Sequence, residues 1–199
     1  MAYPTVSAPY GFKPVNRLDG LPYAGAVRPF SVAGTSNSAI FNGDLVQLDT
    51  NGQIIPLASG GTSNATYVIG VFTGCSYTSP ATNQKLFSQY LPASTAAADI
   101  TAFVVDDPAA VFKVAVTLAN SVVSTASTAS VGSNMSVVLG AGSTTNGDSK
   151  FSVLAGSEST DTLLARVVGV VTETATGVDT FQELVVKINN HQYNNRTGV

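Results

Sequence analysis

The sequence is poor in charge, has no tryptophan, and contains a single cysteine and a single histidine. Only 11% of its 199 residues are charged, against about 25% in an ordinary globular domain. A surface with so few charges lacks the usual repulsion between copies, which favours packing against other protein. The nine lysines and arginines are spread thinly and form no basic stripe, so we expect no nucleic-acid partner.

The scarcity of reactive side chains argues against an enzyme. Cys75 has no second cysteine to pair with, and its place beside a strand pattern predicts a small buried thiol. His191 lies in the polar stretch INNHQYNN, where we expect it to form hydrogen bonds at a surface or an interface. One cysteine and one histidine cannot make a structural zinc site, and no phosphate-binding or dinucleotide-binding motif is present. We therefore predict a protein without catalytic residues, cofactor or metal.

Long apolar runs are also missing. No stretch of about eighteen apolar residues exists, so we expect no membrane span. The opening MAYPTVSAPYGFKPVNR lacks the basic and apolar regions of a signal peptide, which predicts synthesis in the cytoplasm without export. Hydrophobic residues nevertheless make up 44% of the chain, enough to build a sizeable core.

Residues 1–30 form a segment of their own, which is rich in proline and aromatic residues. Five of the nine prolines lie here, and proline at this density leaves extended backbone rather than helix or central strand. We expect an arm that lies on another surface, either a neighbouring subunit's or that of its own β structure. Its candidate contact residues are Tyr3, Tyr10, Phe12, Pro14, Arg17, Tyr23, Arg28 and Phe30.

From residue 31 onward the patterns are those of β structure. The stretch GDLVQLDTNGQIIPLASG, residues 43–60, predicts two strands joined by a type I′ turn at Asn51-Gly52. The apolar run YVIGVFTG, residues 67–74, predicts a further strand in which Gly70 indicates a bulge or the close approach of another backbone. Asp106-Asp107 before a proline predicts a turn. Further strands are predicted in KLFSQYL, DITAFVVDD, AVFKVAVTL and TFQELVVKINN.

The pattern of residues 43–74 recurs in residues 132–173. This predicts a degenerate duplication, and the alternative is that short hairpins resemble one another by chance. The candidate structural glycines of the two passages are Gly52, Gly70, Gly147 and Gly169, with Gly70 and Gly169 in equivalent places. If backbone approaches closely at both, valine at either position should damage folding.

Together these patterns predict an all-β fold of barrel, β-tulip-like or sandwich modules built from short antiparallel hairpins, with an extended proline-rich N-terminal arm. The predicted parts are the arm (residues 1–30), a module with the first hairpin (31–118) and a module with the second hairpin and the last strand (119–199). The two modules could equally form one composite domain, 31–199.

The text GDLVQLDTNGQIIPLA followed by YVIGVFTG resembles the head decoration, or capsid cement, proteins of tailed bacteriophages. The opening APYGFKPVNRLDGLPYAGAVRPF also resembles phage virion proteins whose proline-rich arms cross onto neighbouring subunits. The resemblance implies a β module on the outer capsid surface, often a trimer, and it brings no catalytic residues. Its partners would be the major capsid protein and further copies of the chain, as a homotrimer more readily than as a homodimer.

We therefore expect a non-enzymatic virion protein that clamps neighbouring capsomers and stabilises the expanded head. The alternative is another virion component, such as a tail-tube, head-fibre or spike subunit. A carbohydrate-binding module would need exposed tryptophan or tyrosine platforms, and tryptophan is absent. We also expect that deleting residues 1–30 leaves a folded β domain that no longer binds capsids.

Overall fold

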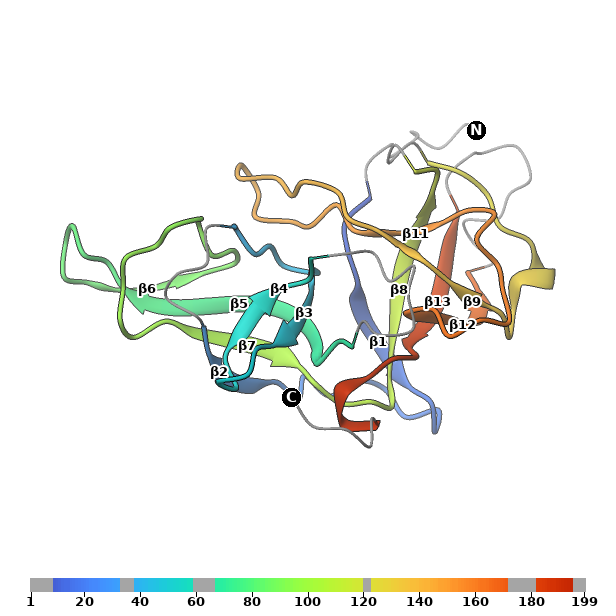
Figure 1. Cartoon of the computed structure of the whole chain (residues 1–199), viewed down its shortest axis with the longest axis horizontal. Helices are drawn as coiled ribbons and strands as arrows, with labels where there is room; N and C mark the ends of the chain where they lie inside the picture. The colour runs from blue at the N-terminus through green and yellow to red at the C-terminus, as the bar shows by residue number, and fades with distance from the viewer. Residues whose placement is uncertain (1–8, 33–37, 59–66, 120–122, 172–181, 195–199) are drawn as a thin grey trace.

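The computed structural model describes residues 9–32, 38–58, 67–119, 123–171 and 182–194. These residues form two β sheets and two short 3₁₀ turns, and no α-helix occurs among them. The all-β prediction is therefore confirmed, and the strand pairing is largely antiparallel. Figure 1 shows the two sheets at opposite ends of an elongated molecule.

One sheet has six strands and uses a continuous part of the chain. Its strands lie in the order β2-β7-β5-β3-β4, and β6 pairs with the distal half of β5. The strands are β2 (Arg28–Ser31), β3 (Leu45–Leu48), β4 (Ile54–Pro56), β5 (Gly70–Thr78), β6 (Lys85–Ser88) and β7 (Thr101–Val105). The hairpin of β5 and β6 forms the end of the molecule farthest from the other sheet (Figure 1).

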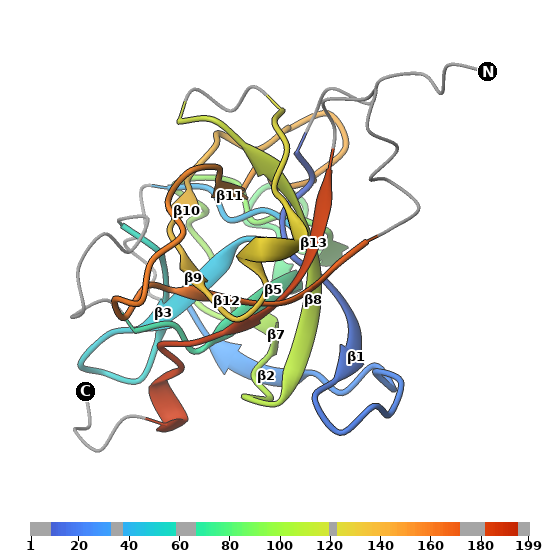
Figure 2. The same ribbon diagram turned by 90° about the vertical axis from the view of Figure 1, so that its right-hand side faces the viewer.

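The other sheet has seven strands and nearly closes into a barrel. Its order is β10-β11-β8-β13-β12-β9, and β1 pairs with β8. The strands are β1 (Lys13–Arg17), β8 (Ala110–Thr117), β9 (Asn134–Met135), β10 (Val137–Val138), β11 (Ser152–Leu154), β12 (Ala165–Val170) and β13 (Glu183–Ile188). Only Ser136 separates β9 from β10, although they stand at opposite ends of the order. This one stretch of chain therefore joins the two ends, and Figure 2 faces the barrel end of the molecule.

Two hydrophobic cores meet at the strands β3, β5 and β7. Leu45 and Val71 pack into the barrel core, whereas the next residue in each strand, Val46 and Phe72, packs into the core of the six-stranded sheet. Successive side chains of a strand point to opposite faces. This part of the six-stranded sheet therefore acts as a wall between the two cores, which explains why its strands are apolar on both faces.

The two repeated passages adopt the same pairing order. In the first, β3 lies between β4 and β5; in the second, the stretch of β9 and β10 lies between β11 and β12. Strands β7 and β13 then pair with β5 and β12 respectively. The pairing thus follows the sequence similarity, and common descent of the passages stays a prediction. Hydrogen bonding crosses the predicted module boundary, because β8 pairs with β11 and β13.

The first hairpin turns differently from the prediction. A type I′ turn needs positive φ at both central residues, but Gly52 (φ 72°) has it and Asn51 does not. Gly52 N–H donates to Asp49 O at 3.1 Å, and Asp49 N–H donates to Gln53 O at 2.9 Å, which makes a three-residue loop closed by a left-handed glycine. The Asp49 carboxylate also accepts from the Asn51 and Gln53 amides at 2.9 and 2.8 Å. This side-chain bonding selects the longer loop.

The glycines predicted to be equivalent differ in their surroundings. A Cβ at Gly70 would lie 2.1 Å from the carbonyl oxygen of Val105, so another backbone does approach closely there. A Cβ at Gly169 would meet no atom of the described residues within 4 Å. The condition for damage by valine at Gly169 is therefore not met among the described residues, and this glycine lies instead at a register shift between β12 and β13. Gly147 has φ 76° in the loop between β10 and β11.

Candidate functional site: the arm and the junction of the two sheets

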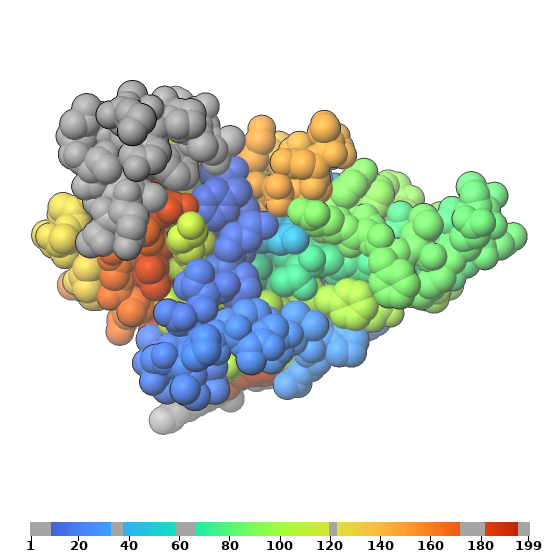
Figure 3. Space-filling model, turned by 180° about the vertical axis from the view of Figure 1, so that it is seen from behind, coloured from blue at the N-terminus to red at the C-terminus, as the bar shows by residue number. Residues whose placement is uncertain are grey.

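The described part of the predicted arm, residues 9–30, lies along the outside of its own chain (Figure 3). Among the described strands, β1 pairs with β8 alone and β2 with β7 alone, so both are outermost strands of their sheets. Outermost strands tolerate proline, which explains the positions of Pro14 and Pro29. Tyr3 lies outside the described residues. Contact of the arm with a neighbouring subunit stays a prediction.

Phe12 is not available as an anchor for a partner in this structure. Its side chain is only 1% exposed, and its ring packs edge-on against Phe112 in the barrel core, with a centroid distance of 6.3 Å. The sequence suggested an external contact because a proline-rich segment cannot bury an aromatic ring against itself. The pairing of β1 with β8 supplies the missing burial, and that pairing joins residues about a hundred positions apart.

Tyr10 fastens the arm to the last strand through a buried polar cluster. Its hydroxyl donates to Oε1 of Glu183, and Nζ of Lys113 lies 3.2 Å from the same oxygen. Glu183 is 5% exposed, so water solvates its carboxylate poorly, and Tyr10 and Lys113 stabilise the charge instead. Burial, and then the hydrogen bond with Glu183, raise the pKa of Tyr10 well above its usual value, so the phenol stays protonated.

Four apolar side chains of the same segment remain exposed on the surface. These residues are named here the arm face: Val15, Leu18, Leu21 and Val27, which are 36%, 48%, 56% and 45% exposed. The backbone at Val15, Leu18 and Leu21 is paired: Val15 lies in β1, Leu18 N–H donates to Ala109 O at 2.9 Å, and Arg17 N–H donates to Leu21 O at 2.8 Å and closes a hairpin. An exposed apolar group on a fixed backbone is typical of a contact site between proteins.

The two arginines of the arm are bound to the turn between β7 and β8. Arg17 Nε lies 3.0 Å from Asp107 Oδ2, and Arg28 Nε lies 2.9 Å from Asp106 Oδ2. Asp107 Oδ1 also accepts from the Ala109 amide at 2.8 Å, as expected of a turn. Both arginine charges of the arm are therefore compensated by the chain itself.

The other two aromatic residues predicted for the arm lie partly on the chain's own cores. Tyr23 packs against the barrel core and donates its hydroxyl to Ala26 O at 2.6 Å. Phe30 packs against the core of the six-stranded sheet. Both side chains are half-buried, so each keeps part of its surface on the outside of the molecule.

His191 is buried, contrary to the surface position expected from its polar surroundings. Its side chain is 1% exposed, because residues 190–192 run beside Val68 and close the junction of the two sheets. The 3₁₀ turn η2 (Gln192–Asn194) follows at once, and Tyr193 N–H donates to His191 Nδ1 at 3.2 Å. Burial lowers the pKa of His191, so it favours the neutral form. Its contribution to stability is lost as the pH falls below the usual histidine pKa.

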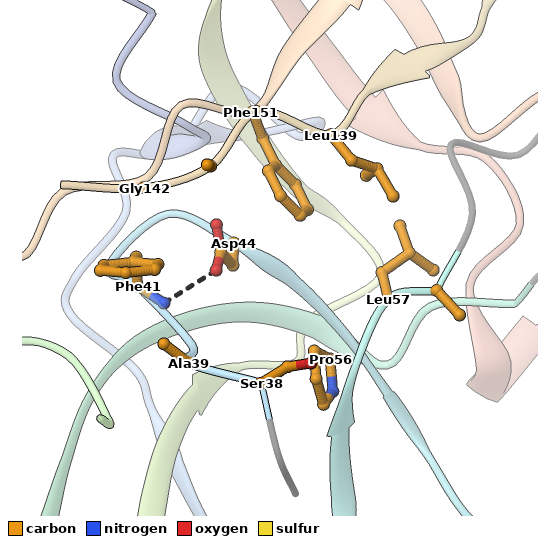
Figure 4. A pocket seen from close by; sticks show the side chains of 12 residues that line it. Ser38, Ala39, Phe41, Asp44, Pro56, Leu57, Leu139, Gly142 and Phe151 are labelled. Carbon is orange, nitrogen blue, oxygen red and sulfur yellow. Dashed lines mark hydrogen bonds between the residues drawn. The ribbon is translucent and has the colours of Figure 1, made fainter. Parts of the chain in front are cut away.

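A half-open cavity of about 320 Å³ lies where the first hairpin meets the long loop between β10 and β11. Phe41 and Leu57 line one side, and Leu139, Gly142 and Phe151 line the other (Figure 4). A Cβ at Gly142 would lie 2.3 Å from the Phe41 ring, so glycine allows the loop to approach. The described lining is mostly apolar.

Asp44, beside this cavity, serves the backbone rather than a ligand. Its Oδ2 accepts from the Phe41 amide at 2.8 Å, whereas Oδ1 is sealed from solvent and has no hydrogen-bond partner among the described residues. Burial raises the pKa of Asp44 to about 6, although the Ser149 hydroxyl and the Phe41 amide lower it in part.

We expect Asp44 to reduce the free energy of unfolding by about 2 kcal/mol as the pH rises from about 4 to 7. Its pKa is higher in the folded chain than in the unfolded one, so the folded state holds the proton longer and ionisation inside the fold is unfavourable. Urea unfolding across this range should show wild type losing stability relative to Asp44→Asn. Asp49→Asn is the control, because Asp49 is exposed and its pKa is lowered. A pH-independent difference between wild type and Asp44→Asn would rule out this role.

The described residues contain no group of three or more His, Cys, Asp or Glu side chains that could hold a metal ion. Cys75 is buried, which raises the pKa of its thiol to about 11. No helix in the described part of the chain is long and apolar enough to span a membrane.

Sequence reasoning missed the polar contacts that hold the two sheets together. Lys13 Nζ lies 3.1 Å from Asn42 Oδ1 and 3.2 Å from Asp148 Oδ1, and Gln89 Nε2 donates to Asp148 at 3.0 Å. These residues come from four separate parts of the chain. No local pattern could have connected them, because each appears in the sequence as an ordinary polar loop or strand residue.

No protein-family model matches the chain, and neither a curated protein nor a solved structure is significantly similar to it.

Proposed function

We propose that the chain is a non-enzymatic virion protein that binds the outer surface of a phage capsid. In this role it bridges neighbouring capsomers and stabilises the expanded head. Its partners are the major capsid protein and further copies of the chain. The observation that carries the proposal is the arm face, a set of exposed apolar side chains of which Val15, Leu18 and Leu21 stand on backbone that is already paired.

The charge distribution around the arm supports docking on another protein. Arg17 forms an ion pair with Asp107, and Arg28 forms one with Asp106. A partner that covers the arm face therefore does not have to desolvate an unpaired arginine. The hairpin beneath the face is formed before binding, which reduces the entropy lost on docking. A capsid presents many equivalent sites, so modest contacts at each copy add up to a stable assembly.

The direct test is binding of the purified chain to heads of the virus that encodes it, stripped of this protein. Co-sedimentation should show binding to expanded heads and little binding to unexpanded precursors. A tail-tube subunit would instead form rings by itself, which electron microscopy would detect. Absence of the chain from purified particles would contradict the proposal.

Replacing two arm-face residues together, Leu18→Ser with Leu21→Ser, should weaken head binding by about a hundredfold, roughly tenfold for each apolar anchor lost. Both side chains are about half exposed, so the melting temperature should change little. Val131→Ser is the matched control, because Val131 is 46% exposed and belongs to a different surface segment. Unchanged binding by the double variant would remove the arm face from the mechanism.

A further inference from the structure

β6 is an outermost strand that carries an unusually exposed aromatic side chain. Phe87 is 78% exposed, the highest value among the large apolar side chains of the described residues, and its neighbour Leu86 is 38% exposed. Among the described strands, β6 pairs only with β5. The hairpin forms the far end of the molecule, where it stands clear of the barrel (Figures 1 and 3). An open strand edge with exposed apolar residues favours pairing with another chain.

The phase of the β5–β6 ladder shows which backbone groups are open. Ser79 N–H donates to Gln84 O at 2.9 Å, so this pair is a hydrogen-bonded one. Hydrogen-bonded and non-hydrogen-bonded pairs alternate along an antiparallel ladder. In the observed register, Leu86 and Ser88 therefore bond to β5, whereas Lys85 and Phe87 do not. The N–H and C=O groups of Lys85 and Phe87 point away from β5, and no described residue binds them.

We propose that two copies of the chain associate through β6, pairing antiparallel about a twofold axis with Phe87 opposite Phe87 of the second copy. This register lets the two Phe87 residues exchange N–H to C=O hydrogen bonds. It also keeps equivalent faces of the two sheets on the same side, as an antiparallel ladder requires. The two phenyl rings become direct cross-strand neighbours, a stabilising pair.

The charges of β6 favour a second copy as the occupant. Lys85 is the only charged residue of the strand, and its Nζ lies 2.8 Å from Asp99 Oδ2 within the same chain. In the proposed register Lys85 faces residue 89 of the other copy and not the other Lys85. Neither copy therefore brings an uncompensated charge to the shared edge, so two identical edges can approach without repulsion.

The contact is short, so we expect association in the range of about 0.1 mM for the free chain. Copies held side by side on a larger assembly would pair more completely, because their effective concentration is higher. The inference concerns contact between copies and does not depend on the proposed capsid role. A chain that dimerises through β6 but binds no head would support this inference and contradict that function.

Sedimentation velocity of the full chain, from about 1 µM to 1 mM, tests the association. Wild type should form dimers. Phe87→Pro should weaken dimerisation at least about tenfold, because proline removes the outward N–H and the ring. The same change spares the ladder with β5, to which residue 87 donates nothing, so the variant should stay folded. Val131→Ser is the control and should dimerise like wild type. Serine is used there because proline would alter the C-cap of the 3₁₀ turn that ends at Ser130.

Disulfide cross-linking tests the register independently. Opposed residues of a hydrogen-bonded antiparallel pair have Cα atoms about 5.5 Å apart, which a disulfide can bridge. With oxidised glutathione as the electron acceptor, Phe87→Cys should yield a covalent dimer, and Val131→Cys should not. The native Cys75 is buried and should not interfere.

Three results would overturn the inference. The first is a wild-type chain that stays monomeric up to about 1 mM. The second is a Phe87→Cys chain that associates without forming the disulfide, because the two residues would then not lie opposite each other. The third is a dimer that persists in Phe87→Pro and leaves Phe87→Cys uncross-linked, since its contact would then lie elsewhere.

Discussion

Gly70→Ala is expected to lower the free energy of unfolding by at least about 3 kcal/mol, and Gly70→Val by more. A Cβ at this position would lie 2.1 Å from Val105 O and 2.9 Å from Val104 Cγ1. The nearer atom belongs to the backbone of β7, which is held between β2 and β5, so it cannot move aside without breaking the sheet. Chemical denaturation monitored by circular dichroism measures the loss.

Gly169→Ala is the matched control for this prediction. It makes the same chemical change in a strand of the other sheet, where an added Cβ meets no atom of the described residues within 4 Å. Its effect should stay within about 1 kcal/mol, since alanine also reduces the freedom of the unfolded chain. Equal losses at the two glycines would show that close backbone approach is not the cause.

Phe12→Ala should cost about 3–5 kcal/mol of stability, the usual range for emptying a buried phenylalanine site. Phe12 and Phe112 pack together in the barrel core, so the deletion leaves a cavity between β1 and the barrel. Phe87→Ala makes the same change at a side chain that is 78% exposed, and it should alter the free energy of unfolding by less than about 0.5 kcal/mol. Urea unfolding of the two variants measures both losses of stability and so distinguishes a core phenylalanine from a surface one. Similar values for both variants would contradict the burial of Phe12.

The same geometry revises the expected outcome of deleting residues 1–30. That deletion would remove β1, the Phe12 side chain and most of β2, so we no longer expect it to leave an intact β domain. Loss of head binding by such a truncated chain would report unfolding as readily as a lost contact. Substitutions on the arm face are therefore the informative test, because they leave both strands in place.

Local patterns predicted the strands well, and their partners poorly. Alternation and β-branched residues marked the two hairpins, because these features depend on residues close together in the sequence. Gly70 indicated a bulge or a close neighbour, but nothing local identified that neighbour as Val105. The parallel pairing of β8 with β11, by contrast, depends on residues about thirty-seven positions apart in sequence, such as Val116 and Val153. No short-range pattern specifies such a pairing.

For the candidate contact residues, too, the sequence predicted the local features but not those that depend on long-range pairing. The sequence located an apolar, aromatic arm, but it could not separate the inward Phe12 from the outward Leu18 and Leu21, since that depends on which strand β1 joins. It also gave no weight to Phe87, which looked like any strand aromatic. Exposure is a property of the finished fold, and only the pairing of β6 with one neighbour revealed it.

The position of β8 also affects the order in which the molecule can be completed during translation. This strand holds β1 from the beginning of the chain and β13 from near its end. The six-stranded sheet has all its strands by residue 105, whereas the barrel lacks β13 until residues 183–188 have been made. On the ribosome the six-stranded sheet can therefore form first, while the apolar strands of the incomplete barrel stay exposed. Early termination would release a chain with an incomplete barrel, which would be prone to aggregate.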